Sequence, residues 1–215
     1  MTIDAHTHNL EATDAIIAVE PNAFSPQPGK LYSVGIHPWH TDTSTDDDLM
    51  RLREATQHPQ VVAIGETGLD NLRGAPLARQ TEIFERHLLL AQELGKPVII
   101  HSVRTSQQVV QCCRRLGITV PCAIHGMRGN ERVARPLLDA GFYLSFGPRF
   151  NPSTVLATPQ DRLLIETDDT GMTIAQVAAA ISPILHLTVP NLLALAAQNL
   201  NTFLVKNTEK VKQQK

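Results

Sequence analysis

Residues 61–101 have the sequence VVAIGETGLDNLRGAPLARQTEIFERHLLLAQELGKPVIIH. Two short apolar runs, at 61–66 and 97–101, flank a segment from Ala78 to Leu94 whose apolar residues recur at the spacing of one helical face. Gly95 follows in the position where helices commonly end. Apolar strands separated by a helix are typical of a parallel sheet covered by helices. This stretch therefore predicts one strand–helix–strand unit, and both of its strands end in a polar side chain, Glu66 and His101.

The same alternation extends over the whole chain. We expect further strands at 2–8, 15–20, 31–37, 121–125, 142–146 and 163–168, and further helices at 46–57, 105–116, 130–140, 173–184 and 192–205. The tail KVKQQK is expected to be frayed. Eight strands alternating with helices predict an α/β fold, a (β/α)8 barrel of the TIM type, built from residues 1–215 as a single domain.

The N-terminal part of the chain is short for this fold. Only 28 residues separate His8 from His37, which is too few for two full strand–helix repeats of about 30 residues each. We therefore expect helices to be missing or reduced to turns on that side. Either a partner subunit covers the barrel there, or the pocket is unusually open.

Composition and charge narrow the function classes. The net charge of −2 shows no basic excess of the kind typical of dedicated nucleic-acid binders, so a polynucleotide substrate would have to be held locally. The N-terminus MTIDAHTHNL has no secretory pattern, and no run approaches the roughly 18 apolar residues of a membrane span. The three cysteines form neither a zinc motif nor an even disulfide set and are expected to be reduced thiols. These features favour a soluble cytoplasmic protein with no membrane association and no obligatory protein partner.

Candidate metal ligands end most of the apolar runs. Because side chains two apart on a strand share a face, His6 and His8 can hold one ion. In a parallel barrel the carboxyl ends of all strands meet at one face, where active sites lie. Alone, His101 or His125 is more simply a hydrogen-bonded core residue, and a helix cap is an alternative for Asp168. Together the candidates form a set whose imidazoles and carboxylates suit Zn, Mn, Fe or Ni and, less well, Mg: His6, His8, Glu66, His101, His125 and Asp168.

Several blocks of the chain carry a family resemblance. The blocks IDAHTH, SVGIHPW, VVAIGETGLD, QTEIFERHLLLAQELGKPVIIHS, AIHG, YLSFG, LLIETD and NLNTF occur in order from residue 3 to about 204. They resemble the TatD family of metal-dependent deoxyribonucleases, within the amidohydrolase superfamily. The resemblance implies hydrolysis of DNA phosphodiester bonds from a 3′ end, by water activated between two divalent metal ions.

The resemblance also implies roles for individual residues. His6, His8 and Asp168 would hold one ion, His101 and His125 the second, and Glu66 would bridge them. A bridging carboxylate suits two cations about 3.5 to 4 Å apart, since they repel each other and lower the pKa of water held between them. Asp168 would orient that water and accept its proton, so that Glu66 and Asp168 are the expected catalytic residues.

Residues beside these ligands are candidates for support and substrate contact. Asp4 and Asp70 lie close enough in sequence to orient metal-bound imidazoles, although either could simply be a turn or cap residue. Candidate substrate-binding residues are those whose rings could stack on a base or whose cations could contact phosphate: His37, Trp39, Arg73, Arg104 and Arg128. For His37 a loop packed under the barrel rim is an equally simple alternative, and for the arginines an exposed position without a partner is.

The substrate loops depart from the family pattern. Arg104 stands one position later than the family's arginine, Arg128 lies in Gly126–Gly129 where the family has Cys-Phe-Ser-Gly, and Asp169 adds a negative charge beside Asp168. That charge disfavours a polyanion. Two alternatives therefore stay open: a hydrolase of a small ester, amide or phosphoester, and a catalytically impaired metal-binding relative.

Overall fold

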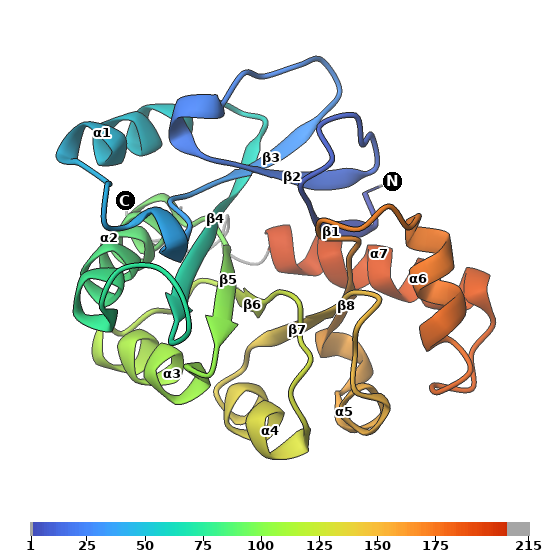
Figure 1. Ribbon diagram of the computed structural model, residues 1–215. Coiled ribbons are helices and arrows are strands. Elements are labelled where there is room, and N and C mark those ends of the chain that lie inside the picture. Colours follow the sequence, from blue (N-terminus) through green and yellow to red (C-terminus); the bar gives the residue numbers. More distant parts are fainter. Residues whose placement is uncertain (1, 206–215) are drawn as a thin grey trace, which may run out of the picture.

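The computed structural model describes residues 2–205, so the tail KVKQQK lies outside the described residues. Its eight strands are all parallel and form a closed barrel in sequence order, because β1 pairs with both β2 and β8 (Figure 1). The strands are β1 Asp4–Thr7, β2 Ala15–Val19, β3 Leu31–Val34, β4 Val61–Asp70, β5 Val98–Val103, β6 Cys122–Ile124, β7 Tyr143–Phe146 and β8 Leu163–Ile165. The predicted (β/α)8 barrel is confirmed.

Helices surround the barrel at the predicted places (Figure 1). They are α1 Asp46–Ala55, α2 Leu77–Leu94, α3 Ser106–Arg115, α4 Glu131–Asp139, α5 Pro152–Ala157, α6 Ile174–Ile181 and α7 Val189–Val205, with 3-10 turns η1 Pro21–Ala23, η2 Pro38–His40 and η3 Gln160–Arg162. Local chemistry sets their ends: Thr45 and Asp48 form a capping box at the start of α1, and Gly95 closes α2 at φ 65°. The sequence prediction missed α5, because six residues show too little helical periodicity.

The N-terminal side lacks helices, as predicted: none lies between β1 and β2, and only η1 lies between β2 and β3. The chain's own loops cover these strands instead. Phe24 packs edge-on against Tyr32, with ring centroids 5.4 Å apart, and the Lys30 ammonium donates a hydrogen bond to the Leu10 carbonyl. Ile16 is fully buried. The chain's own loops therefore bury the strands on this side of the barrel.

The strand β4 is longer than predicted, and two glycines explain its path. Gly65 and Gly68 have φ of 137° and 141°, in the region that disfavours side chains. A Cβ at either position would also overlap a carbonyl oxygen of β5, that of Ile99 or His101. The two strands therefore approach closely, which brings Glu66 on β4 next to His101 on β5.

Apolar side chains fill the barrel interior at its N-terminal end. Small and large apolar residues from most strands, among them Ala5, Ile16 and Ile99, pack there against Leu200 and Phe203 of α7. Phe203 contacts Tyr143 with ring centroids 5.3 Å apart. Since α7 closes this end, a site inside the barrel can open only at the C-terminal ends of the strands.

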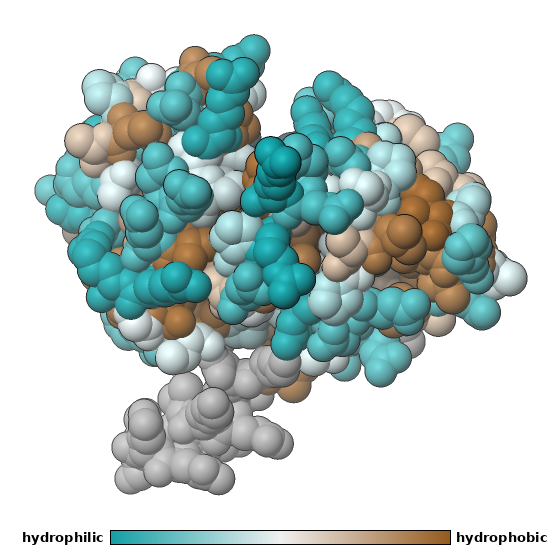
Figure 2. All heavy atoms as spheres, turned by 90° about the horizontal axis from the view of Figure 1, so that it is seen from below, coloured by the Kyte–Doolittle hydropathy of each residue, from teal (hydrophilic) through white to brown (hydrophobic). Residues whose placement is uncertain are grey.

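Residues 170–205, which include α6 and α7, contain no Asp, Glu, Lys or Arg. Seen from below in Figure 2, apolar residues gather on the side of the molecule where these helices lie. Within residues 2–205, no helix combines the length and the apolar character that crossing a membrane requires.

Candidate metal centre

Glu66 lies at the centre of the open end of the barrel. Its carboxylate is buried, and five imidazoles surround it. Oε2 lies 3.3 Å from His6 Nε2 and 3.2 Å from His8 Nε2. Oε1 lies 2.8 Å from His101 Nδ1 and 2.8 Å from His125 Nε2. Each oxygen of this carboxylate therefore faces a different pair of predicted ligands.

The first half of the metal centre, formed by His6, His8 and Asp168, joins the first strand of the barrel to the segment after the last strand. His8 N donates to the Asp168 carbonyl at 3.1 Å, and Asp168 N donates to the His6 carbonyl at 3.0 Å, which continues the β1–β8 contact. This backbone pairing places Asp168 Oδ1 3.8 Å from Nε2 of both His6 and His8. His8 is the exposed member, with 45% of its side chain accessible, whereas His6 is fully buried.

The second half is held by carboxylates behind the imidazoles. His101 Nε2 lies 3.1 Å from Asp70 Oδ2, and His125 Nδ1 lies 3.3 Å from Glu166 Oε1. Glu166 Oε1 also accepts a hydrogen bond from Gly126 N at 2.7 Å. Carboxylates in this position fix the orientation of an imidazole and raise its basicity.

The electrostatics around His101 and His125 favour a charged pair of Glu66 and His125. Burial alone would raise the pKa of Glu66, but the charge of His125 and hydrogen bonds from His101, His125 and His37 hold it well below its usual range. Burial alone would lower the pKa of His125, but the charges of Glu66 and Glu166 and their hydrogen bonds raise it well above its usual range. Glu66 is therefore an anion at neutral pH, as a metal ligand must be.

The sequence prediction was wrong about one carboxylate next to the metal ligands, Asp4, and did not include another, Glu166. Asp4 does not contact an imidazole: its carboxylate accepts from His6 N and Thr167 N, at 3.3 and 3.1 Å, and from the Thr167 hydroxyl at 2.6 Å. It therefore ties β1 to the segment after β8, while burial raises its pKa to about 7. Glu166 was missed. Its position two residues before Asp168 at a strand end was the signal, because residues two apart share a face.

The donor set fits divalent metal ions. Both ring nitrogens of His6 are buried without a hydrogen-bond partner among the described residues, although Nε2 lies 3.3 Å from Glu66 Oε2. Buried polar atoms without partners are costly, and a metal ion would satisfy Nε2. The groups whose candidate ligand atoms lie within 4.8 Å of one another are His6–His8–Asp168, His6–Glu66–His125, His37–Glu66–His101 and His125–Glu166–Asp168. Imidazole and carboxylate in this mixture suit Zn, Mn, Fe or Ni.

His37 and Trp39, two of the predicted substrate-binding residues, adjoin the centre on η2 and the loop before it. His37 Nδ1 accepts a hydrogen bond from Trp39 N at 3.2 Å, so its other nitrogen, Nε2, faces Glu66 Oε1 at 3.0 Å. The Trp39 indole donates to Asp70 Oδ2 at 2.7 Å, and its side chain is 40% exposed. An accessible aromatic ring is thus connected through Asp70 to His101.

The three predicted arginines lie in loops at the same end of the barrel. The Arg73 guanidinium lies 4.8 Å from the centre of the Trp39 ring, and Arg128 NH2 lies 3.7 Å from Asp168 Oδ2. Arg104 is exposed, with a φ of 56°. The structure therefore brings Arg73 and Arg128 to the centre, while it leaves Arg104 without an ion pair among residues 2–205.

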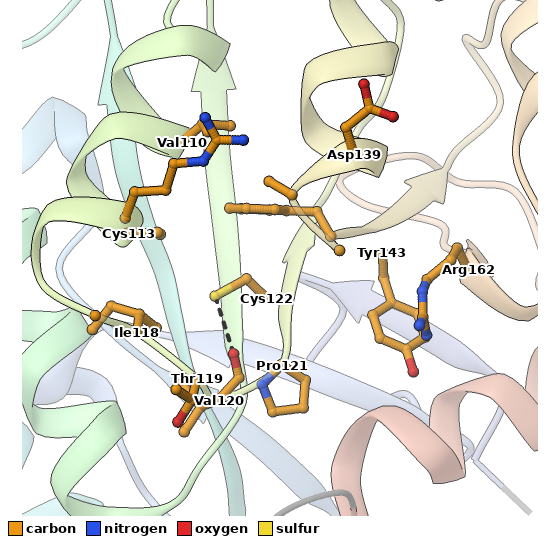
Figure 3. Close-up of a pocket in the computed structure, with 15 residues that line it drawn as sticks. Val110, Cys113, Ile118, Thr119, Val120, Pro121, Cys122, Asp139, Tyr143 and Arg162 are labelled. Carbon is orange, nitrogen blue, oxygen red and sulfur yellow. Dashed lines mark hydrogen bonds between the residues drawn. The ribbon is translucent and has the colours of Figure 1, made fainter.

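A separate cavity of about 670 Å³ lies away from this centre, around the loops that lead into β6 and β7 (Figure 3). Cys113 and Cys122 both line it. A hydrogen bond with Cys113 and burial raise the pKa of the Cys122 thiol well above its usual range. Such a thiol is a poor nucleophile at neutral pH. Together with Cys112, these cysteines are free thiols, as predicted, and none adjoins the metal centre.

Comparison with known proteins places this geometry in context. The family model described as TatD related DNase matches residues 3–211. An uncharacterized metal-dependent hydrolase, YabD of Bacillus subtilis, is 37% identical over 145 residues, which cover 63% of this chain and 57% of YabD. The 3′-5′ ssDNA/RNA exonuclease TatD of Musicola paradisiaca is 34% identical over 152 residues, which cover 66% of this chain and 58% of that protein. The matches thus span little more than half the length of these relatives.

A solved structure has the same fold. The Escherichia coli TatD homologue YJJV superimposes with a TM-score of 0.83 at 22% identity, over 94% of this chain and 97% of that chain. Nearly the whole of that chain is therefore matched here, including its barrel.

Proposed function

The chain belongs to the TatD related DNase family, and we propose that it is a hydrolase that uses two divalent metal ions to cleave DNA phosphodiester bonds from a 3′ end. The observation that carries the proposal is the Glu66 carboxylate, whose two oxygens each face a different pair of the predicted ligand histidines at 2.8 to 3.3 Å. A carboxylate shared in this way is suited to hold two cations together.

In this proposal His6, His8 and Asp168 hold one ion, His101 and His125 hold the other, and Glu66 lies between them. When bound, the two ions would lower the pKa of the attacking water and neutralise charge on the phosphate. Asp70 and Glu166 keep His101 and His125 in their orientations through the contacts of 3.1 and 3.3 Å. The native metal is one of Zn, Mn, Fe, Ni or Mg.

Asp168 is the proposed acceptor of the proton from water. Its side chain is 15% exposed, so it reaches both His6 and His8 and the open mouth of the barrel. Oδ1 faces His6 and His8, while Oδ2 faces Arg128. The backbone bonds to β1 fix this position, so that Oδ1 or Oδ2 can orient a water and take its proton.

The loops around the centre are proposed to bind the nucleic acid. Trp39 offers an accessible ring for stacking on a base, which is a common and sequence-tolerant contact to single strands. Arg128 would contact the phosphate next to Asp168, with Arg73 beside Trp39, and Arg104 further along the rim. His37 Nε2 adds a donor that faces the centre.

Cleavage of labelled DNA tests the proposal. Metal-reconstituted protein is incubated with single-stranded DNA carrying a fluorophore at the 5′ or the 3′ end, and Glu66→Gln controls for contaminating nuclease. Shortening from the 3′ end by the wild type alone is the expected result. If the wild type binds two ions per chain and leaves both DNAs intact, DNA is not the substrate.

A second candidate is hydrolysis of a smaller ester, amide or phosphoester. The exposed Asp169 beside Asp168 favours it, because a negative charge at the mouth repels a polyanion. A screen of small substrates, with Asp168→Asn as control, distinguishes the two. Turnover of small substrates alone would support this candidate, and no turnover with two ions bound would indicate a catalytically impaired metal-binding relative.

A further inference from the structure

Charged residues are distributed unevenly over the loops that follow the C-terminal ends of the strands. The four consecutive strands β4, β5, β6 and β7 are each followed, within four residues of their last residue, by an exposed arginine. These are Arg73, Arg104, Arg128 and Arg149, which we call the arginine arc. Because all strands of a parallel barrel end at the same face, the arc follows one half of its rim.

The other half of the rim carries negative charge. Exposed acidic residues follow β8, β1 and β3: Asp169, Glu11 and Asp42. The net charge of −2 over the whole chain therefore does not show this local separation of charge. A polyanion is attracted to the β4–β7 half of the rim and repelled from the other half.

Ion pairing separates the arc from most arginines elsewhere on the molecule. On the outer helices, arginines such as Arg53 and Arg135 lie within 2.9 Å of a carboxylate oxygen. Within residues 2–205, in contrast, Arg73, Arg104 and Arg149 form no ion pair, and the one carboxylate near Arg128 is Asp168 of the metal centre. Unpaired guanidinium groups keep their donors free for phosphate oxygens.

From this distribution we infer that the arginine arc is a binding track for the phosphate backbone of a single strand, running along the rim beside the metal centre over β7, β6, β5 and β4, with Arg149 as a contact not otherwise assigned. Three steps of about 4.8 Å between strands make the arc about 14 Å long at the barrel wall. One phosphate for each of its four arginines gives about four phosphate contacts.

The inference rests on the proposed function for its substrate, but its test uses binding and not cleavage. Fluorescence anisotropy measures the affinity for a labelled single-stranded octanucleotide in EDTA, at 50 and 200 mM salt as in standard counterion-release experiments. Four phosphate contacts predict a slope of log K against log salt of about −2.8, or a loss of about 50-fold in affinity over this range. Each arginine changed to Gln should reduce the size of the slope by about 0.7.

Matched variants distinguish the track from general charge. Arg149→Gln and Arg104→Gln should each reduce the slope, whereas Arg149→Lys should keep it. Arg114→Gln is the control, because Arg114 is also exposed and without an ion pair among the described residues. It lies in the last turn of α3, beside the loops that lead into β6 and β7 and not beside those that follow them. The track is overturned if Arg114→Gln lowers the slope as much as Arg149→Gln, or if none of the arc variants changes it. Binding with the expected slope but no cleavage by metal-loaded protein would instead contradict the proposed function alone.

Discussion

His87 predicts how the stability of this protein depends on pH. The residue is fully buried in α2, where Nδ1 donates to the Ile83 carbonyl at 2.8 Å and Nε2 accepts from Ile36 N at 2.9 Å. Only a neutral imidazole can make both bonds, because the protonated ring has no acceptor. Burial accordingly lowers the pKa of His87 from 6.5 to about 4.

The sign and size of the effect follow from this shift. Between pH 6.5 and 4 the unfolded chain binds a proton at His87 that the folded chain does not, so the free energy of unfolding falls as the pH falls. At about 1.4 kcal/mol per pH unit, the loss is about 2 kcal/mol at pH 5 and about 3 kcal/mol at pH 4. Above pH 6.5 the residue makes no pH-dependent contribution.

Urea denaturation of the wild type and His87→Gln at pH 7 and pH 5 measures the pH-dependent contribution of His87 to the free energy of unfolding. Glutamine can still accept from Ile36 N but does not titrate, so the variant should be less stable at pH 7 and should lose about 2 kcal/mol less than the wild type between pH 7 and 5. The other titrating groups are common to both proteins and cancel in the comparison. If both proteins lose the same stability over this range, His87 is not held neutral and the reasoning is wrong.

Three further outcomes follow from the structure. Glu166→Gln should weaken metal binding by 10- to 100-fold, because Glu166 orients His125. A competition titration with a chromogenic chelator measures this affinity, and an unchanged affinity would contradict the prediction. Lys30→Met should increase amide hydrogen exchange near Leu10, because it removes the bond that holds this loop, whereas Lys30→Arg should preserve protection; equal exchange in the wild type and the Met variant would contradict this. Phe203→Ala should lower the free energy of unfolding by about 3 to 5 kcal/mol, because it opens a cavity at the closed end of the barrel. A loss below about 1 kcal/mol in urea denaturation would show that α7 does not close this end of the barrel.

Most of the fold is encoded in local patterns. The apolar runs and helical spacings gave all eight strands and six of the seven α-helices, because strand and helix periodicities are properties of neighbouring residues. The placement of Glu66 and His101 at strand ends also followed from the sequence, since the barrel brings such ends to one face. The missing helices between β1 and β3 followed from chain length alone.

Contacts between distant residues depended on closure of the barrel. Asp4 and Thr167 are 163 residues apart, and their hydrogen bond exists because β1 pairs with β8. That pairing turned Asp4 from an expected partner of an imidazole into a link between strands. The function of Glu166 as the carboxylate behind His125 depends in the same way on strands that are distant in sequence.

The sequence by itself determined the barrel, the loss of its first helices and the residue types of the metal centre, because these depend on composition and on spacing along the chain. Only the tertiary structure decided that each oxygen of Glu66 faces a different pair of the predicted ligand histidines, and that exposed arginines from four loops share one half of the rim. The physical reason is that distances and charge fields between strands are set when the sheet closes, and closure brings together residues whose separation in sequence carries no information about their separation in space.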